Sequence, residues 1–216
     1  TIEGTFETEK KKTFTASLIE YNGKGLEKFD IKNENNARDT IAELTLGSWH
    51  IERVEKKHRE QASLAPFTTS TLQQESSRRL RFSAKQTMML AQQLYEGIEL
   101  AEGSVGLITY MRTDSTNLSR QSQDAARAYL ETNFGKEYAL ETPREFKKKS
   151  KGAQEAHEAI RPSDVYKTPE SLKSHLDPKQ FKLYDLIWRR FVASQMPNAV
   201  FDMTTIDVRS KKEPVQ

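Results

Sequence analysis

The sequence contains no cysteine among its 216 residues. Disulfide bonds and thiolate zinc sites are therefore excluded within it, and nothing in it indicates an oxidising compartment. Long hydrophobic runs are lacking as well. None approaches the roughly 20 residues that a membrane-spanning helix needs, and no secretory signal is visible. We therefore expect a cytoplasmic protein without a membrane partner, and Thr1 begins in mid-pattern, as in a piece excised from a longer chain.

Neither sign of charge is in large excess. Lys and Arg number 34 and Asp and Glu number 31, which gives a net charge of +3. This balance permits a nucleic-acid partner without arguing for one, so the placement of basic residues matters more than their number. With 35% hydrophobic and 30% charged residues, the chain is polar but differs from a disordered one.

The first sixty residues carry strand and turn patterns. Residues 1–12 are polar and predict a solvated lead-in, whereas residues 13–21 have the alternation of a strand. Asn22-Gly-Lys-Gly25 is a strong turn signal, after which residues 28–31 are expected to pair back. Asn33 is a suitable N-cap for a following helix.

Helical patterns replace these from Pro66 onward. Ser83-Ala-Lys-Gln86 has the form of a capping box, and Asp177-Pro-Lys-Gln180 places proline at the first position of the clearest helix. After the capping box at Ser83, apolar residues recur at helical spacing and predict a buried stripe: Ala84, Met88, Ala91, Tyr95 and Ile98. Residues 200–209 alternate as a strand again.

The order of these patterns predicts an α+β, multidomain chain. We expect a helical domain at residues 66–196 to be inserted into a discontinuous, incomplete β-rich domain at residues 1–65 and 197–216.

The segment from Gly106 to Leu118 gathers groups that suit phosphate chemistry. An apolar entry is followed by a phenol, a guanidinium, a carboxylate and several hydroxyls. In an extended backbone Tyr110, Arg112 and Asp114 would point the same way. A fixed positive charge beside a phenol helps the phenolate form and then stabilises charge on phosphoryl oxygens. The alternative is a half-buried strand tyrosine followed by a polar loop.

Three runs together resemble a known family. The run GLITYMRTDSTNLS that begins at Gly106 resembles the active-site segment of bacterial type IA DNA topoisomerases. The run QEAHEAIRPSD that begins at Gln154 resembles a second motif of that family, and the run PFTTSTLQQ at Pro66 resembles the entry to its helical catalytic domain. The three runs follow the family's order.

The resemblance implies a role for Tyr110 as the nucleophile. Its hydroxyl would attack a phosphodiester of single-stranded DNA and become linked to the 5′ phosphate, while the 3′ hydroxyl leaves and later reverses the attack. Because the bond energy is retained in the phosphotyrosine, no nucleotide cofactor is needed. The whole enzyme would pass strands through the break and relax negatively supercoiled DNA.

The neighbours of the tyrosine are assigned to the phosphate. Arg112 would hold the scissile phosphate, or else form a surface salt bridge with Asp114 or Glu99. Asp114 would orient Arg112 or a histidine, or else cap the following turn. Thr113 is assigned with them to DNA binding.

Four further residues are candidates for DNA contacts. His157 and Arg161 are four residues apart and would share one face of a helix, where two cations can grip adjacent phosphates. No second histidine completes a zinc-protease spacing, so we expect no metal ligands here. Thr68 and Thr69 lie where a helix starts, and backbone contact with DNA and simple N-capping explain them equally well.

The family's acidic, magnesium-binding Toprim domain has no counterpart in this sequence. We expect Mg²⁺ to belong to the full-length enzyme and no cofactor to be bound by this fragment, which would be inactive alone. The partners expected are single-stranded DNA and the Toprim and remaining domains of the same parent chain, in a bacterial, nucleoid-associated monomer. A non-enzymatic single-stranded-DNA-binding module, or the equivalent piece of topoisomerase III or reverse gyrase, remains as the alternative.

Overall fold

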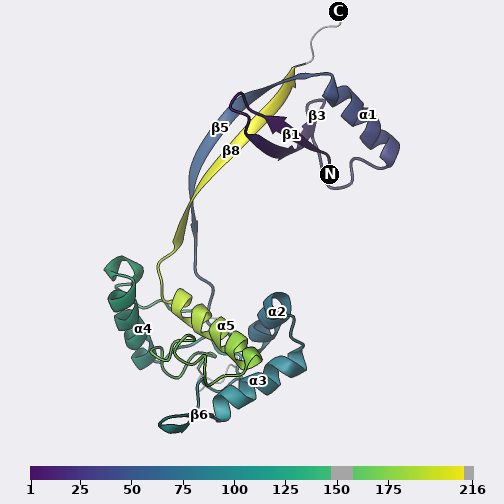
Figure 1. Cartoon of the computed structure of the whole chain (residues 1–216). Helices are drawn as coiled ribbons and strands as arrows, with labels where there is room; N and C mark the ends of the chain where they lie inside the picture. The colour runs from purple at the N-terminus through teal and green to yellow at the C-terminus, as the bar shows by residue number, and fades with distance from the viewer. Residues whose placement is uncertain (147–157, 212–216) are drawn as a thin grey trace, which may run out of the picture. The chain divides into compact units, whose positions relative to one another are not determined.

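A computed structural model describes residues 1–146 and 158–211. The chain divides into two compact units, the first made of Thr1–Arg59 and Phe201–Gln216, the second of Glu60–Val200 (Figure 1). The prediction of an α+β chain in which a helical part interrupts a strand-rich part is confirmed. In chain order the elements are β1 Glu3–Glu7, β2 Thr13–Ser17, β3 Glu20–Tyr21, β4 Lys24–Gly25, α1 Glu34–Thr45, β5 Ser48–Gln61, α2 Thr69–Leu80, α3 Ala84–Glu96, β6 Ile98–Leu100, β7 Gly103–Val105, α4 Arg120–Asn133, the 3-10 turn η1 Lys136–Tyr138, α5 Pro178–Ser194 and β8 Ala199–Lys211.

The first unit begins with a strand that the sequence pattern did not predict. β1 pairs antiparallel with β2, with Phe6 opposite Phe14. The two rings stack with centroids 5.4 Å apart, and Trp49 meets Phe6 edge-on at 5.2 Å. The prediction of a solvated lead-in was wrong because Phe6 is one apolar residue in a polar run, and its partners lie elsewhere in the chain.

Short-range signals in this unit were more reliable. The expected turn joins β3 to β4, with Asn22 and Gly23 both at positive φ. Asn33 caps α1 by accepting a hydrogen bond from the backbone of Asn36. Residues 28–31 do not form the expected strand and instead turn, with Phe29 exposed. β8 pairs with β5, so the last strand returns to this unit.

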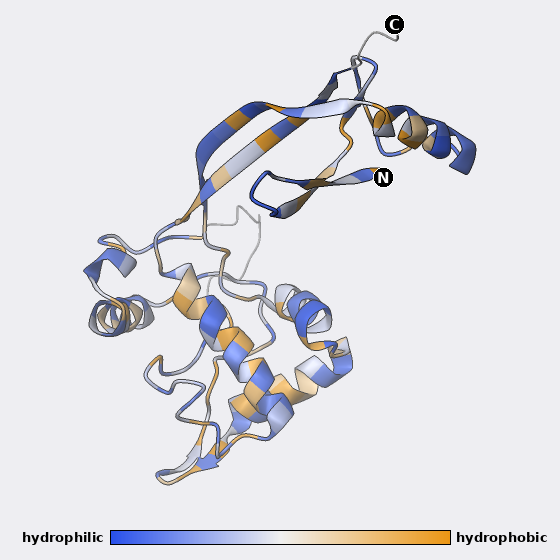
Figure 2. Cartoon of the chain, turned by 45° about the horizontal axis from the view of Figure 1, so that its top comes forward, coloured by the Kyte–Doolittle hydropathy of each residue, from blue (hydrophilic) through white to orange (hydrophobic). Residues whose placement is uncertain are grey.

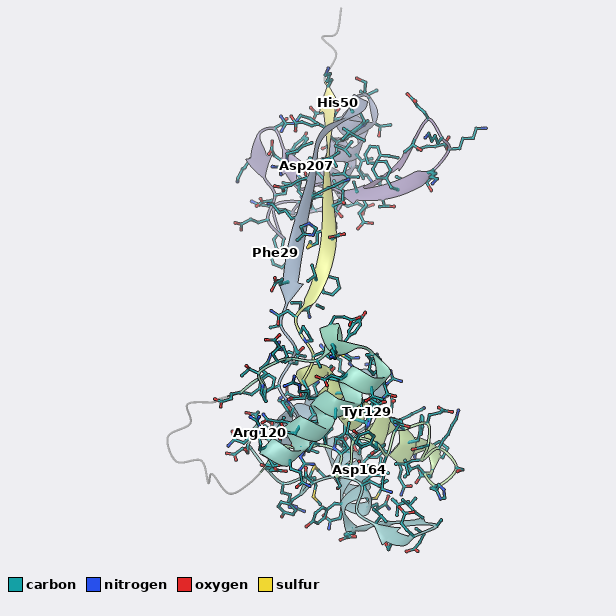
Figure 3. The ribbon with its side chains drawn as sticks, turned by 90° about the vertical axis from the view of Figure 1, so that its left-hand side faces the viewer. Phe29, His50, Arg120, Tyr129, Asp164 and Asp207 are labelled. Carbon is teal, nitrogen blue, oxygen red and sulfur yellow. The ribbon has the colours of Figure 1, made fainter. Side chains whose placement is uncertain are left out.

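In the second unit α3 and α5 pack together and α2 packs against both. Figure 2 shows apolar and polar stripes alternating along these helices. α5 starts after Asp177 with proline at its first position, as expected, and Asp177 and Gln180 form a capping box. The helix buries one face, from Leu183 to Val192. On α4, Tyr129 (labelled in Figure 3) packs edge-on against Trp188 of α5, with centroids 5.6 Å apart. No helix in the described part of the chain is both long and apolar enough to span a bilayer.

The buried stripe of α3 differs from the predicted one. Thr87, Leu90 and Leu94 are buried together with Ala91, whereas Ala84 and Tyr95 are exposed. The helix is rotated by about one residue because two leucines gain more from burial than an alanine and a tyrosine. Tyr95 is thereby left on a face that points towards the tyrosine segment.

Candidate active site

The three sequence runs, which lie far apart in the chain, are hydrogen-bonded to one another. Phe67 forms an isolated antiparallel bridge with Ile160, and Ile108 forms another with Pro162. All four residues belong to the second unit. The run that contains Arg161 therefore lies between the other two and is joined to each by backbone hydrogen bonds.

Thr109 ties this arrangement together and was not singled out from the sequence. Its hydroxyl donates to the carbonyl of Ala159 at 2.7 Å and accepts from the backbone N–H of Arg161 at 3.0 Å. Its own N–H donates to the Arg161 carbonyl at 3.0 Å. The only signal in the sequence was a hydroxyl residue between an apolar pair and Tyr110, which is too common to be informative.

The segment around Tyr110 alternates between exposed and buried side chains. Met111 is fully buried and Thr113 is 7% exposed, whereas Tyr110, Arg112 and Asp114 are exposed. The segment forms no regular strand, yet its extended course gives the alternation of one. The three residues that carry the chemical groups therefore share the solvent side, and the residues between them anchor the backbone.

Tyr110 is 41% exposed and meets Tyr95 edge-to-face, with ring centroids 5.5 Å apart and planes at 67°. The end of α3 is held close to the segment. Leu107 donates to the Leu94 carbonyl at 2.7 Å, and a Cβ at Gly106 would lie 2.6 Å from the Tyr95 carbonyl oxygen. Glycine at position 106 thus permits the close approach of the two backbones, which places the phenol against the last turn of α3.

Arg112 and Asp114 are both exposed, which leaves their charged groups accessible. Among the residues that the structure describes, Arg112 forms no ion pair, so the surface salt bridge with Asp114 or Glu99 that the sequence left open is not formed with either of them. The positive charge of Arg112, two residues after Tyr110 in the chain, is available to an anionic ligand.

The threonines predicted to contact DNA form hydrogen bonds within the protein. Thr68 is 2% exposed and caps α2 together with Thr71, each side chain bonding the other's backbone N–H. Thr69 bonds to the backbone of Met111 and Thr113. The Thr113 hydroxyl accepts from the N–H of Ser115 at 3.0 Å. These threonines hold the segment in place.

Arg161 is also satisfied within the protein. Its side chain is 12% exposed, and its guanidinium donates to Glu158 at 2.5 and 3.0 Å and to the Pro162 carbonyl at 2.8 Å. Residues 158–163 are extended rather than helical because their backbone pairs with Phe67 and Thr109. The helical face assumed for His157 and Arg161 is therefore not formed by this part of the run. His157 lies outside the described residues.

A partly buried charge network joins α2 to α5. The Glu75 side chain, 10% exposed, accepts from Arg78 and Arg79 and lies 3.7 Å from Arg190. The guanidinium of Arg190 lies 4.2 Å from the ring centre of Phe67. The basic residues of α2 thus serve partly to neutralise Glu75, and Arg190 connects α5 to the bridge that Phe67 makes.

Glu75 gives a stability prediction. Burial raises the pKa of Glu75, but the hydrogen bonds from Arg78 and Arg79 outweigh this effect and leave the pKa below its ordinary value of 4.5. Glu75→Gln should lower the free energy of unfolding of the second unit by about 3 kcal/mol at pH 7, because Arg190 is left buried without its counter-charge. Because the pKa of Glu75 is lower in the folded state than in the unfolded state, its carboxylate stabilises the fold at pH values above the unfolded-state pKa. The difference in unfolding free energy between the two proteins should therefore shrink as the pH falls through the folded-state pKa.

Urea unfolding followed by tryptophan fluorescence measures this effect. The sequence has two tryptophans, and a Trp49→Phe background leaves Trp188 to report on the second unit alone. Glu170→Gln is the control because Glu170 is 79% exposed in its ion pair with Lys173, and it should change stability by less than about 0.5 kcal/mol. Equal effects of the two substitutions would contradict the role given to Glu75.

The described residues contain no group of three or more histidine, aspartate or glutamate side chains that could hold a metal ion. The described part of the chain therefore offers no donor set that fits the Mg²⁺ implied by the family resemblance, and we derive no step through a metal.

The DNA topoisomerase family matches this sequence over residues 1–216, and the chain belongs to that family. Its relatives include the DNA topoisomerase 1 of Rickettsia felis, which is 45% identical over 200 residues, 93% of this chain and 26% of that protein. The DNA topoisomerase 1 of Rickettsia prowazekii is 44% identical with the same coverage of both chains. The family expectation drawn from the three sequence runs is confirmed.

A solved structure is similar as well. The full-length topoisomerase I of Thermotoga maritima matches with a TM-score of 0.68 and 40% sequence identity, over 81% of this chain and 28% of that one. The chain thus spans about a quarter of the length of the Rickettsia relatives, 26% in both cases.

Proposed function

We propose that this chain is the tyrosine-bearing segment of a type IA DNA topoisomerase and that Tyr110 is its nucleophile. The phenolic oxygen attacks the phosphorus of a single-stranded DNA phosphodiester, a new O–P bond forms, and the bond to the 3′ oxygen breaks. The phenolic proton ends on the departing 3′ hydroxyl. Reversal of the same steps reseals the strand, so no energy source is consumed.

One observation carries this proposal. Three runs that resemble family motifs are bonded into one site, and that site leaves Tyr110, Arg112 and Asp114 exposed while it buries Met111 and Thr113. A tyrosine enclosed by the core could not reach DNA. Here the phenol is on the solvent side, two residues before Arg112, whose guanidinium has no ion pair within the described residues.

The other site residues divide into two groups. Arg112 binds the scissile phosphate and stabilises the charge that develops on its oxygens, with Asp114 orienting it. His157 is assigned to a second phosphate contact. Thr68, Thr69 and Thr113, which the sequence assigned to DNA contact, act on the protein backbone in this proposal, since their hydroxyls are bonded there. Arg161, which the sequence also assigned to DNA contact, acts on Glu158 and on the Pro162 carbonyl, to which its guanidinium is bonded.

This chain would be a segment of a longer parent protein, to which the remaining properties belong. Its Toprim domain would hold Mg²⁺, its substrate would be negatively supercoiled DNA, and it would act as a monomer beside the chromosome of a bacterial cytoplasm. The two compact units would correspond to the expected β-rich and helical domains, with boundaries moved from 65/66 and 196/197 to 59/60 and 200/201. The isolated segment would bind DNA weakly and would not relax it.

The polarity of the covalent link tests the proposed function. The parent protein is incubated with a single-stranded oligonucleotide labelled at its 5′ or 3′ end, and the reaction is stopped with denaturant. We expect the label downstream of the break, at the 3′ end, to remain attached to the protein, because the tyrosine holds a 5′ phosphate. Retention of the 5′ label would indicate a 3′-phosphotyrosine and a different class of enzyme. Tight binding with neither label retained would support a non-enzymatic single-strand-binding module.

A further inference from the structure

Thr69 contacts the tyrosine segment on both sides of Arg112. Its hydroxyl oxygen lies 2.7 Å from the carbonyl oxygen of Met111, 3.1 Å from that of Thr113 and 2.9 Å from the Thr113 nitrogen. A hydroxyl has one proton to donate, and the shorter contact places it on Met111. A lone pair then accepts the N–H of Thr113, so one side chain bonds the residue before Arg112 and the residue after it.

These bonds matter because Arg112 has no other means of fixing its position within the described residues. Its side chain is exposed and forms no ion pair there, so the position of the backbone sets the region that the guanidinium can reach. The arginine side chain is long, so a small rotation of the backbone at Arg112 would displace the guanidinium by a larger distance. The orientation of the charge therefore depends on the backbone between Met111 and Thr113.

The backbone that carries the Thr69 side chain is itself held in place. Its N–H donates to the Thr113 carbonyl at 2.8 Å. Thr68 caps the same helix, and the preceding Phe67 is fully buried in its bridge with Ile160, beneath the guanidinium of Arg190. These contacts of Phe67, Thr68 and Thr69 fix the first turn of α2. The Thr69 hydroxyl therefore holds the exposed segment against a fixed part of the fold.

The geometry points to Thr69 as a positioning residue that sets Arg112 against the scissile phosphate. This inference rests on the proposed function and adds to it a residue that touches neither DNA nor the reacting atoms. It differs from the role that the sequence predicted for Thr69, a direct DNA contact. A DNA contact would contribute to binding, whereas a positioning residue contributes to the rate of cleavage by the bound enzyme.

The test uses Thr69→Val, which keeps the shape of the side chain but can neither donate nor accept. In the parent protein we expect the single-turnover rate of cleavage of a bound single-stranded oligonucleotide to fall by roughly 10- to 100-fold, the loss typical of a small misplacement of a catalytic group. The dissociation constant of the oligonucleotide should change less than about twofold, and Thr69→Ser should restore the rate to within roughly threefold of the original.

Two further comparisons separate positioning from general destabilisation. Thr87→Val removes the hydroxyl of a fully buried threonine, which donates to the carbonyl of Ser83, the N-cap of α3, at 3.0 Å. This substitution should leave the cleavage rate unchanged. If Thr69 acts through Arg112, the double variant with Thr69→Val and Arg112→Ala should cleave only slightly more slowly than the Arg112→Ala variant alone. Thr69→Ala serves in the same comparison if the valine variant does not fold.

The possible results divide clearly. A normal cleavage rate in Thr69→Val, full additivity with Arg112→Ala, no rescue by serine, or a loss in Thr87→Val as large as in Thr69→Val would each overturn the inference. A loss that resides entirely in the dissociation constant would return Thr69 to the role of a DNA contact. Failure of the proposed function would look different, because the unsubstituted protein itself would then form no covalent adduct.

Discussion

Replacing Tyr110 with phenylalanine should abolish covalent capture of single-stranded DNA by the parent protein. The substitution removes one oxygen and leaves the ring, which packs against Tyr95 with centroids 5.5 Å apart. Without the nucleophile no O–P bond can form, and we expect adduct formation to fall by roughly 10⁴-fold or more. Non-covalent affinity for the same oligonucleotide should change by less than about threefold, because Arg112 and the other basic residues remain.

Tyr138→Phe is the matched control for this substitution. Tyr138 is 47% exposed, close to the 41% of Tyr110, and it lies in η1, outside the three runs that form the site. Its variant should capture DNA at the original rate. An adduct that persists in Tyr110→Phe would mean that another residue is the nucleophile. Equal loss in both variants would mean that the effect is not specific to the proposed site.

Replacing Arg112 with alanine should have the second largest effect. The guanidinium is the charged group expected to face the phosphoryl oxygens, and removing one donor of this kind costs about 10²- to 10³-fold in rate in other enzymes. Arg112→Lys keeps the charge but loses the planar pair of donors, so we expect an intermediate loss of roughly tenfold. Single-turnover cleavage of a labelled oligonucleotide measures both, with the dissociation constant recorded in parallel.

Arg189→Ala provides the control for charge. Arg189 is 73% exposed on α5 and is paired with Asp185, so its loss changes the net charge by the same amount without touching the site. Its cleavage rate should stay within about twofold of the original at 0.15 M salt, where exposed charges are largely screened. If alanine at 112 and alanine at 189 lowered the rate equally, Arg112 would be acting through the overall field of the protein rather than on the phosphate.

Much of the local structure was predictable from short-range chemistry. Asn33, Ser83 and Asp177 were expected to cap helices and do so, because a cap is decided within four residues. N-capping was one of two explanations offered for Thr68 and Thr69, and Thr68 is the cap of α2. Several adjacent hydroxyl residues offer equivalent caps, and the choice falls on Thr68 because Phe67 is anchored by its bridge to Ile160.

Packing between residues far apart in the chain was harder to predict from the sequence. The strand around Phe6 depends on Phe14 and Trp49, and the rotation of α3 depends on which face α2 and α5 cover. The site shows the same division. The exposed side chains of Tyr110 and Arg112 follow from two-residue alternation in an extended segment. The partners of Thr69 could not be predicted, because they come from a run 42 and 44 residues away whose pairing only the fold determines.

The most direct test of the central claim is to identify the residue that carries the DNA. The covalent adduct formed by the parent protein with a short single-stranded oligonucleotide is trapped, digested with protease and nuclease, and analysed by mass spectrometry. We expect a nucleotide mass attached through phosphate to Tyr110, in the peptide that contains Met111 and Arg112. A nucleotide attached to any other residue, or no covalent nucleotide under conditions in which the protein relaxes DNA, would contradict it.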